Sequence, residues 1–558
     1  MNENYDYAYL AELLFPEVTE TPEDMEKRYP PRNLPEGAKV TRFAPSPTGF
    51  IHLGNFYGTL TDERLAHQSG GILYLRIEDT DSKREVEGGV AMIIQMLDKY
   101  GIHFDEGATI NGDKGDYGPY RQSERVGIYH VYAKQLVKEG KAYPCFCTPE
   151  ELTAIRAEQE GQKLTPGYYG KWAVWRDAPI EEIKKMLDAA TPYVLRLRSD
   201  GVEGQTMKFT DLIKGQIDVT PNFIDHVILK SDGIPDYHLA HAVDDHLMRT
   251  THVVRDESWL PSLPLHIELF RDLGFKMPKY IHTAQVLKFE DGKKRKLSKR
   301  KDPEFGMSFF YSDGYPTIVT TEYILTLLNS NYEEWRAANP ALPYTDFPFS
   351  IKKMSPSGCV FDYDKLNDIS RTLISRLTTD EVYEQALAWA QEYSPSLADK
   401  LMRDPAYAKQ ILSIGRGGKK PRKDIGKWSE VESYISLFYD DSFAYHDKIT
   451  FGTEISAISI MDILRDFSDT YSEADDANTW FDKIKSIAEK NGYAADMKLY
   501  KSNPAAYKGS IADVSGYIRI AVTGKAVSPD LYTVMQILGR ERVLARVSRA
   551  YQALLDND

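Results

Sequence analysis

Cysteine is scarce in this sequence: only Cys145, Cys147 and Cys359 occur among its 558 residues. Three thiols cannot form the disulfide framework that stabilises small secreted domains. No stretch approaches the roughly 18 uninterrupted apolar residues that a membrane-spanning helix requires. The first residues, MNENYDYAYL, lack the basic and apolar regions of a signal peptide. We therefore expect a protein of the cytoplasm, in a reducing compartment and without a membrane partner.

An excess of positive charge is also missing, because 69 basic and 83 acidic residues give a formal net charge of −14. This balance argues against a protein that coats nucleic acid over its whole surface, although it is compatible with local basic patches. The length predicts about three to five domains. Hydrophobic residues make up 42% of the chain, which is enough for large cores.

The segment PSPTGFIHLGN at 45–55 lies between a predicted strand, AKVTRFA, and a predicted helix, FYGTLTDERLAHQ, that ends at two glycines. The next apolar run, ILYLRIEDTD, reads as a buried strand with an acidic end. Strand, turn, helix and strand predict a βαβ unit in a parallel sheet, where ligands bind beyond the C-terminal strand ends. The segment is therefore either a phosphate-binding turn with His52 as a donor or an ordinary βα turn.

A second unusual segment, KKRKLSKRK at 293–301, contains seven basic residues in nine positions. The preceding FEDG indicates a turn, so we expect a mobile cationic loop. Such a loop is either a solvated surface segment or one that closes over a triphosphate and neutralises its charge.

Together, PSPTGFIHLGN and KLSKR resemble the paired ATP signatures of class I aminoacyl-tRNA synthetases, usually written HIGH and KMSKS. RFAPSPTG, YLRIEDTD, GPYRQSERVGIY at 118–129 and PDYHLAHAVDDHLMRTTHVVRDESWL at 235–260 are similar to the glutamyl and glutaminyl branch. The order of these motifs matches the glutamyl-tRNA synthetases from about residue 39 onward. The resemblance implies an α/β fold with a Rossmann-like parallel sheet, an α+β insertion and an all-α C-terminal region of the bacterial type.

The resemblance also implies a domain order. An N-terminal extension (1–38) without an assigned role precedes the first half of the catalytic fold (39–118). An insertion that binds the tRNA acceptor end (119–230), the second half of the catalytic fold (231–290), an ATP-loop and stem-contact region (291–376) and a helical anticodon-binding region (377–558) follow. In the last region, Thr378 and Glu381 form a capping box, and Ser528-Pro529 begins a helix that stops at Gly539. The basic stretch RGGKKPRKDIGK at 416–427 either grips RNA phosphates or is a solvated loop.

The implied reaction is the ATP-dependent attachment of L-glutamate to tRNA(Glu) through a glutamyl-adenylate, with Mg²⁺ accompanying the ATP. The alternatives are a glutaminyl-tRNA synthetase, an enzyme that also charges tRNA(Gln) with glutamate, and an inactive RNA-binding paralogue. The APSPTG form and the helical tail disfavour the first, and the intact signature residues disfavour the last. We expect a monomer.

The family's roles transfer to individual positions of this sequence. By resemblance, Arg42 and Tyr237 face the side-chain carboxylate of glutamate, Glu78 and Ser46 hold its ammonium, and Arg255 holds its α-carboxylate. Two arginines and one carboxylate complement the charges of glutamate. The candidate catalytic residues are His52, Lys296 and Lys299. The candidate ATP-binding residues are Pro45, Thr48, His52, Gly54, Asn55, Lys296, Ser298, Lys299 and Arg300, and the glutamate-binding ones are Arg42, Ala44, Ser46, Glu78, Tyr237 and Arg255.

Metal sites are not expected in the protein itself. CFC at 145–147 resembles the first half of a zinc knuckle, which needs a second ligand pair about 25 residues on. The sequence there, GYYGKWAVWRD, contains no cysteine or histidine. A second alternative, a metal held by the histidines that flank Asp244 and Asp245, is disfavoured because this run matches the catalytic core of the family.

Overall fold

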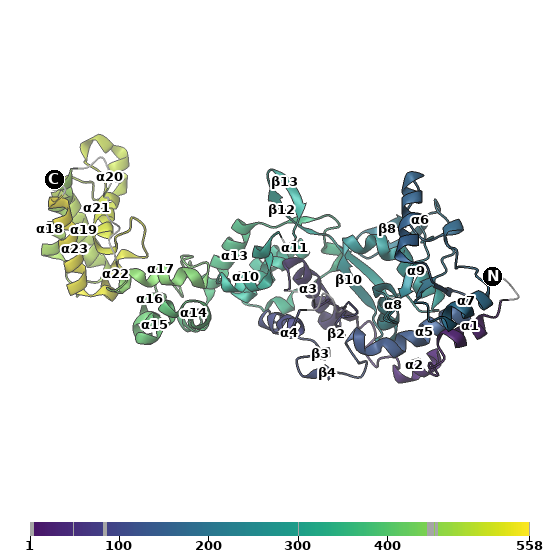
Figure 1. Ribbon diagram of the computed structural model, residues 1–558. Coiled ribbons are helices and arrows are strands. Elements are labelled where there is room, and N and C mark those ends of the chain that lie inside the picture. Colours follow the sequence, from purple (N-terminus) through teal and green to yellow (C-terminus); the bar gives the residue numbers. More distant parts are fainter. Residues whose placement is uncertain are drawn as a thin grey trace. The chain divides into compact units, whose positions relative to one another are not determined.

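The structure, a computed structural model, describes residues 5–47, 50–81, 86–298, 301–443, 451 and 456–556. The chain divides into two compact units, which are shown in Figure 1. The first comprises Met1–Phe310 with Thr320–Asp362, and the second comprises Tyr311–Val319 with Tyr363–Asp558. No helix within the described ranges has the length and apolar character needed to cross a membrane.

A parallel sheet forms the centre of the first unit, as the sequence predicts. Strands β1 (Val40–Phe43), β2 (Ile72–Leu75) and β3 (Glu106–Thr109) pair in parallel, and β4 (Gly112–Lys114) is antiparallel to β3. Helix α3 (Leu53–Gln68) connects β1 to β2, and α4 (Gly89–Lys99) connects β2 to β3. The strands are short and largely buried, since Leu73, Tyr74 and Leu75 are fully inaccessible.

A second parallel pair, β10 (His252–Asp256) and β11 (Lys279–Thr283), lies beside β1. The backbone N–H of Thr251 donates to the carbonyl oxygen of Val40 at 3.0 Å, which joins the two halves of the first unit. The C-terminal ends of β1 and β10 therefore come together, as the sequence predicts for a ligand site.

The segment between these halves combines strands and helices, so the predicted α+β insertion is confirmed. Strands β5 (Ala142–Cys145), β6 (Val194–Leu197) and β9 (Val227–Leu229) form an antiparallel sheet, and β7 (Met207–Asp211) pairs with β8 (Gly215–Val219). The helices of this part and of the adjoining second half are α5 (Val126–Lys138), α6 (Pro149–Gly161), α7 (Ile180–Asp188), α8 (Tyr237–Leu247) and α9 (Leu263–Asp272).

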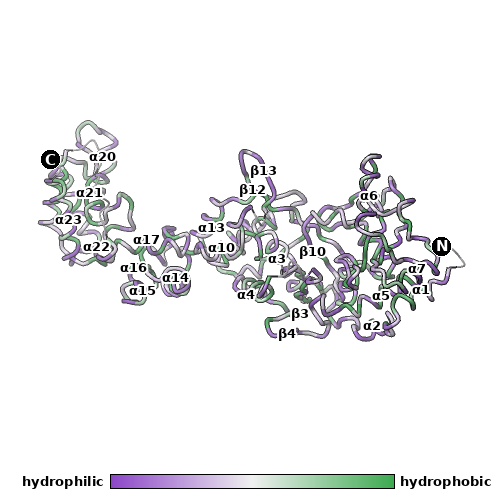
Figure 2. The backbone as a smooth tube through the Cα atoms, viewed as in Figure 1, coloured by the Kyte–Doolittle hydropathy of each residue, from purple (hydrophilic) through white to green (hydrophobic). Residues whose placement is uncertain are grey.

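The cationic segment after β11 forms a hairpin rather than an irregular loop. Strand β12 (Val286–Glu290) pairs with β13 (Lys293–Lys296), and β14 (Cys359–Val360) joins β12 in parallel. Asp291 and Gly292 make the turn with positive φ angles of 49° and 75°. Figure 2 shows the β13 strand of this hairpin in the hydrophilic colour. Helices α10 (Met307–Ser312), α11 (Thr317–Leu328) and α12 (Tyr332–Ala338) follow.

The second unit is helical in its described elements, as the sequence predicts for the C-terminal region. Hydrophobic and hydrophilic residues alternate along its helices (Figure 2), and the apolar faces form one large core. Its main helices are α13 (Tyr363–Arg376), α14 (Thr379–Tyr393), α15 (Pro395–Arg403), α16 (Pro405–Leu412), α17 (Val431–Ile435), α18 (Ala457–Thr470), α19 (Ala477–Lys490), α20 (Met497–Ser502), α21 (Ile511–Thr523), α22 (Leu531–Leu538) and α23 (Arg540–Leu555).

Two helix starts in this unit test the sequence analysis. The predicted capping box before α14 is confirmed, since Glu381 N–H donates to Thr378 Oγ1 at 3.2 Å and Thr378 N–H donates to Glu381 Oε2 at 2.7 Å. Helix α22 begins two residues later than predicted, at Leu531. The reason is that Asp530 is its cap and accepts the N–H of Thr533 at 2.9 Å.

The N-terminal segment before β1 packs onto the rest of the first unit as an arm. It contains α1 (Tyr7–Leu14) and α2 (Pro22–Arg28). Lys134 Nζ of α5 donates to Glu12 Oε2 at 2.8 Å, and Tyr29 OH donates to the carbonyl oxygen of Gly118 at 2.9 Å. The arm thus contacts both helix α5 and the segment that precedes it.

Arg32 makes the most buried of the arm's ion pairs that the described contacts show. Its two Nη atoms donate to the Glu106 carboxylate at 2.7 and 2.9 Å, and its Nε donates to Met248 O at 3.0 Å. Removal of one partner leaves a buried charge uncompensated. We expect Arg32→Ala to lower the free energy of unfolding of the first unit by about 3 kcal/mol, measured by urea denaturation. Lys27→Ala, an exposed change in the same arm, is the control, and an equal effect of both variants would contradict the assignment.

Candidate active site

A cavity of about 160 Å³ opens where the C-terminal ends of β1 and β10 meet the first turns of α3 and α8. Its position is the one that parallel-sheet topology predicts for a ligand. The lining residues are Arg42, Phe43, Ala44, Gly54, Asn55, Gly58, Thr59, Asp62, Glu78, Tyr237, Val254, Arg255, Asp256, Trp259 and Thr283.

Five of the six glutamate-binding candidates line this cavity: Arg42, Ala44, Glu78, Tyr237 and Arg255. The sixth, Ser46, is exposed on the segment that follows β1 and is not among the lining residues. Burial raises the pKa of Tyr237 to about 12, so its phenol keeps the proton and can donate it in a hydrogen bond. The Tyr237 ring lies 4.7 Å from the Trp259 ring, which narrows the cavity from one side.

Two buried arginines share one carboxylate beneath the cavity. Asp245 Oδ1 accepts from Arg76 Nη1 at 2.7 Å and from Arg42 Nε at 3.3 Å. Burial opposes ionisation of Asp245, but the adjacent Arg42 and Arg76 outweigh it and lower its pKa well below the usual range. Arg42 also donates through Nη1 to Val254 O at 3.3 Å. Both of its bonds are at the long end of the hydrogen-bond range, so Arg42 retains capacity for a ligand carboxylate.

The carboxylates of the cavity differ in their tendency to ionise. Burial raises the pKa of Glu78, and Arg76 and Arg42 oppose that rise. The Glu78 Oε1 atom accepts from Arg76 Nη2 at 3.2 Å. Burial raises the pKa of Asp62 well above its usual value, because Arg42 only partly offsets the loss of solvent. An ammonium ion placed beside Glu78 would stabilise its charged form.

Arg255 differs from Arg42 because no carboxylate pairs with it among the described contacts. Its guanidinium stacks over Tyr280 at 4.6 Å and donates to two histidine nitrogens. Its Nη2 atom is buried and has no hydrogen-bond partner within the described part of the chain. An unpaired buried cation on a cavity wall is a strong binding point for an anionic group.

Helix α8 also carries His241, one helical turn from Tyr237. It is fully buried, and its Nε2 contacts Tyr280 OH at 2.8 Å while its Nδ1 lies 3.0 Å from Asp245 Oδ2. Burial lowers the pKa of His241 to about 4 despite the attraction of Asp245. The imidazole is therefore neutral at pH 7 and adds no positive charge to the cavity.

This protonation state predicts how substrate choice depends on pH. The groups that face His241 are Asp245, Tyr280, Tyr237 and His266, with Arg42 and Arg255 close by. Because the pKa near 4 lies below the tested range, we expect the ratio of kcat/KM for glutamate and glutamine to be constant from pH 5.5 to 8.5. His241→Asn should give the same flat profile. If the ratio of kcat/KM for glutamate over glutamine falls above pH 6.5 in the unmodified protein but not in the variant, His241 is protonated at lower pH and contributes to the preference.

The turn at the start of α3 explains part of the PSPTGFIHLGN pattern. His52 caps the helix, since its Nδ1 accepts the N–H of Gly54 at 3.3 Å, and Asn55 Oδ1 accepts the N–H of His52 at 3.3 Å. Gly54 and Asn55 line the cavity, whereas the described positions Pro45 and His52 do not. Thr48 lies outside the described residues. The His52 ring packs 6.5 Å from the Phe305 ring, and a backbone bridge joins His52 to Gly306.

The basic hairpin is tied to the cavity through Lys296. Lys296 Nζ donates to Asp256 Oδ1 at 3.0 Å, and Asp256 lines the cavity. The end of the hairpin is held by Asp302, whose carboxylate accepts from Arg295, Lys288 and the N–H of Ser298, each at 2.7 Å. The hydrogen bond from Arg295 is the main reason that the pKa of Asp302 falls far below its usual range. Lys299 and Arg300 lie outside the described residues.

Several residues of the site were not found from the sequence. Asp256 and Trp259 follow Arg255 at the end of β10 and line the cavity, and the strand-end rule could have indicated them. Asp62 lies on the face of α3 that carries Asn55, two turns on, which helical spacing could have suggested. Asp245 acts from beneath the cavity, and only the tertiary structure shows its contacts.

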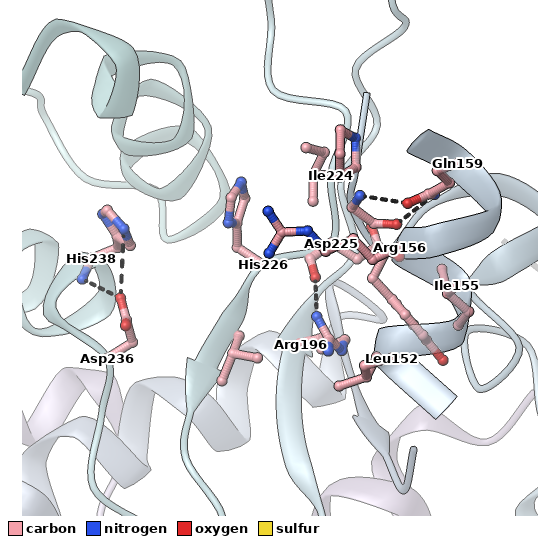
Figure 3. Close-up of a pocket in the computed structure, with 14 residues that line it drawn as sticks. Leu152, Ile155, Arg156, Gln159, Arg196, Ile224, Asp225, His226, Asp236 and His238 are labelled. Carbon is pink, nitrogen blue, oxygen red and sulfur yellow. Dashed lines mark hydrogen bonds and ion pairs between the residues drawn. The ribbon is translucent and has the colours of Figure 1, made fainter. Parts of the chain in front are cut away.

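A second cavity, of about 530 Å³, lies between helix α6, the β5–β6–β9 sheet and the segment before α8. Figure 3 shows Asp236 bonded to His238 on one side and residues of α6 on the other. Arg196 Nη1 donates to Asp225 O at 2.8 Å. The lining residues are Leu152, Ile155, Arg156, Gln159, Pro166, Gly167, Tyr168, Arg196, Ile224, Asp225, His226, Val227, Asp236 and His238.

The zinc-knuckle region contains two thiols and aromatic side chains. Cys147 Sγ lies 3.5 Å from Tyr168 OH. Trp172 stands where the second ligand pair is missing, and its indole N–H donates to Glu158 Oε2 at 3.1 Å. Across the part of the chain that the structure describes, no group of three or more histidine, cysteine, aspartate or glutamate side chains is placed to hold a metal ion.

Comparison with known families and proteins gives the context of this site. Residues 39–342 match the catalytic domain of the class I tRNA synthetases (E and Q), and residues 505–551 match an anticodon binding domain. The glutamate–tRNA ligase of Acetivibrio thermocellus is 50% identical and covers 98% of this chain and 100% of its own length. The glutamate–tRNA ligase of Clostridium perfringens is 46% identical and covers 97% of this chain and 100% of its own length.

A solved structure agrees with these matches. The crystal structure of a glutamate tRNA ligase from Elizabethkingia meningosepticum in complex with its amino acid has a TM-score of 0.75 and 27% identity. It covers 92% of this chain and 99% of the other. With a parallel-sheet catalytic unit, a helical C-terminal unit and near full-length matches at up to 50% identity, the chain belongs to the glutamate–tRNA ligase family of class I aminoacyl-tRNA synthetases.

Proposed function

We propose that this protein activates L-glutamate with ATP as glutamyl-adenylate and transfers the glutamyl group to tRNA(Glu). The observation that carries the proposal is the cavity where Arg42 and Arg255 stand with Glu78 and Tyr237. Two cations and one carboxylate complement the two carboxylates and one ammonium of glutamate. Near full-length similarity to glutamate–tRNA ligases supports the same substrates.

The proposed roles of the residues are those that the resemblance to the family implies, and the cavity brings most of these residues together. Arg42 and Tyr237 bind the side-chain carboxylate, Glu78 binds the ammonium, and Arg255 binds the α-carboxylate that attacks the α-phosphorus. Ser46, by resemblance, assists Glu78. No protein nucleophile is needed, because this reaction depends on positioning and charge neutralisation.

ATP is proposed to bind beside the N-terminus of α3. The backbone at Gly54 and Asn55 approaches the nucleotide, and the helix dipole there favours phosphate. His52 secures this turn, and Pro45 and Thr48 are the other proposed ATP-binding residues of the PSPTGFIHLGN segment. Lys296, Ser298, Lys299 and Arg300 supply the cations and the hydroxyl of the signature loop, and Mg²⁺ accompanies the triphosphate.

Aminoacylation of purified tRNA tests this function. Labelled glutamate and glutamine are each offered with tRNA(Glu) and with tRNA(Gln). We expect tRNA(Glu) to be the RNA that is charged, and glutamate to be the amino acid that is attached to it. Charging of tRNA(Gln) with glutamate would identify the less selective alternative, and no charging of either tRNA would overturn the proposal.

The other parts of the chain have proposed roles in RNA binding. The insertion (119–230) binds the acceptor end, 291–376 contacts the stem and 377–558 reads the anticodon, which the match to an anticodon binding domain supports for its last part. In the basic stretch 416–427, Arg422 pairs with Asp424 and Lys427 pairs with Asp313, whereas Lys419 and Lys420 are exposed. These two lysines are the proposed phosphate contacts. The protein is proposed to act in the cytoplasm as a monomer.

A structural zinc ion is not part of the proposal. Trp172 occupies the region of the second ligand pair, and Cys145 and Cys147 supply only two of the four ligands that zinc requires. We expect less than 0.1 zinc per chain, measured by elemental analysis of protein purified without added metal. One zinc per chain would contradict this expectation. Zinc analysis of the double variant Cys145→Ser and Cys147→Ser would then show whether these two thiols bind the zinc ion.

A further inference from the structure

Arg255 is held by hydrogen bonds on two sides, and both acceptors are histidines. Its Nε donates to His282 Nε2 at 2.9 Å, and its Nη1 contacts His266 Nδ1 at 2.9 Å. His282 is the register partner of Arg255 on the adjacent parallel strand β11, and His266 comes from helix α9. Both imidazoles are fully buried, so solvent does not compete for these bonds.

Chemistry fixes the tautomer of each histidine. An arginine offers only donors, so His282 Nε2 and His266 Nδ1 must both accept. The proton of His282 is then on Nδ1, which lies 2.8 Å from Asp211 Oδ2. The proton of His266 is on Nε2, which lies 2.8 Å from His238 Nδ1.

Each branch of the network ends at an acidic residue. Asp211 is fixed by the N–H groups of Ile213 and Lys214, each at 2.8 Å, and this sets the orientation of His282. On the other branch, His238 Nε2 lies 3.7 Å from Asp236 Oδ1. Figure 3 shows this pair at the wall of the larger cavity.

The protonation states in this network allow His266 and His282 to accept hydrogen bonds from Arg255. Burial lowers the pKa of His266 well below its usual value and also lowers that of His282. Burial opposes ionisation of Asp211, but hydrogen bonds from His282 and from the backbone lower its pKa. The two histidines are therefore neutral near pH 7, and each keeps a lone pair for the guanidinium.

We propose that His266 and His282 are positioning residues that fix the Arg255 guanidinium, so that its unpartnered Nη2 points at the α-carboxylate of the bound amino acid. This inference rests on the proposed function, because it uses the proposed role of Arg255. Holding the cation in advance removes the conformational cost of ordering it when substrate binds. Two neutral histidines serve better here than a carboxylate would, because they leave the positive charge of Arg255 uncompensated until the substrate carboxylate binds.

The test compares variants that keep or remove the accepting atom. Asparagine at 266 places an oxygen near Nδ1, and glutamine at 282 places one near Nε2, whereas leucine removes the acceptor at either position. We expect His266→Leu and His282→Leu to raise the KM for glutamate about 10- to 100-fold in aminoacylation, with the KM for ATP within about threefold of the unmodified value. His266→Asn and His282→Gln should stay within about threefold of the unmodified KM for glutamate.

Two results would overturn the inference: an unchanged KM for glutamate in the leucine variants, or equal impairment by leucine and by the conservative residues, which would indicate packing alone. If a leucine variant does not fold, Asp211→Asn decides, because it removes only the anion that orients His282. A raised KM for glutamate supports the inference, and an unchanged one rejects it.

A further variant, Arg255→Met, separates this inference from the proposed function on which it rests. If it leaves the KM for glutamate unchanged, the proposed role of Arg255 fails. If it raises KM while the histidine variants do not, only the positioning role fails.

Discussion

Replacing Lys299 by alanine is expected to slow glutamyl-adenylate formation by about 10²-fold or more, because one preorganised charge at the transition state is worth about 3 kcal/mol. The proposed role of Lys299 is to neutralise charge on the β- and γ-phosphates as the bond to the α-phosphorus breaks. The lysine belongs to the KLSKR segment, which resembles the ATP signature of the family.

The described residues that flank Lys299 and Arg300 make specific contacts. Asp302 accepts from the N–H of Ser298 at 2.7 Å, immediately before Lys299, and Lys296 reaches Asp256 at the cavity wall. The hydrogen bond between Ser298 and Asp302 therefore ties together the described residues before and after Lys299. A fixed cation contributes more to a transition state than one that must be ordered during the reaction.

Single-turnover adenylate formation measures the effect, and Lys293→Ala is the matched control. Lys293 carries the same charge on the same hairpin but is exposed and is not among the proposed site residues. The control should react at nearly the unmodified rate. Equal rates for Lys299→Ala and Lys293→Ala would remove Lys299 from the mechanism.

The parts of the fold that the sequence predicts are those set by local chemistry. The βαβ unit follows from apolar runs of strand length separated by Pro, Gly and a helical segment, and the structure confirms its parallel pairing. Thr378 and Glu381 lie three residues apart, so their capping box is a local interaction that the sequence shows directly. The same holds for the carboxylate at the end of β2, because strand direction alone places Glu78 at the ligand edge.

The features that could not be predicted from the sequence depend on contacts between distant segments. Four consecutive basic residues form strand β13 because Arg295 is neutralised by Glu290 on the partner strand and by Asp302 beyond it. Pattern rules treat such a run as solvated. Asp245 likewise contacts Arg42 and Arg76 from segments more than 160 positions away. The neutral state of His241 depends on complete burial, which no local pattern encodes.

Arg42→Gln is the second change with a large expected effect, and it concerns substrate choice. The variant should raise the KM for glutamate and lower the ratio of kcat/KM for glutamate over glutamine by about 10-fold. A charge-assisted bond from Arg42 to the side-chain carboxylate is lost, whereas a neutral amide of glutamine never made it. Asp245 lies 3.3 Å from Arg42 and already compensates part of its charge. We therefore expect the lower end of the 10- to 200-fold range that such bonds give.

Glutamine at position 42 is chosen because it removes the charge and keeps a polar side chain. Asp245 remains paired with Arg76 at 2.7 Å in the variant, so no buried carboxylate is left without a cation. The KM for ATP is the internal control and should change by less than about threefold, since the proposed contact of Arg42 is with the amino acid. A raised KM for glutamate with an unchanged ratio would mean that Arg42 supports the pocket without reading the side-chain terminus. If both the KM and the ratio are unchanged, the carboxylate is recognised elsewhere, and Tyr237 becomes the residue to test, because its phenol keeps its proton and lines the same cavity.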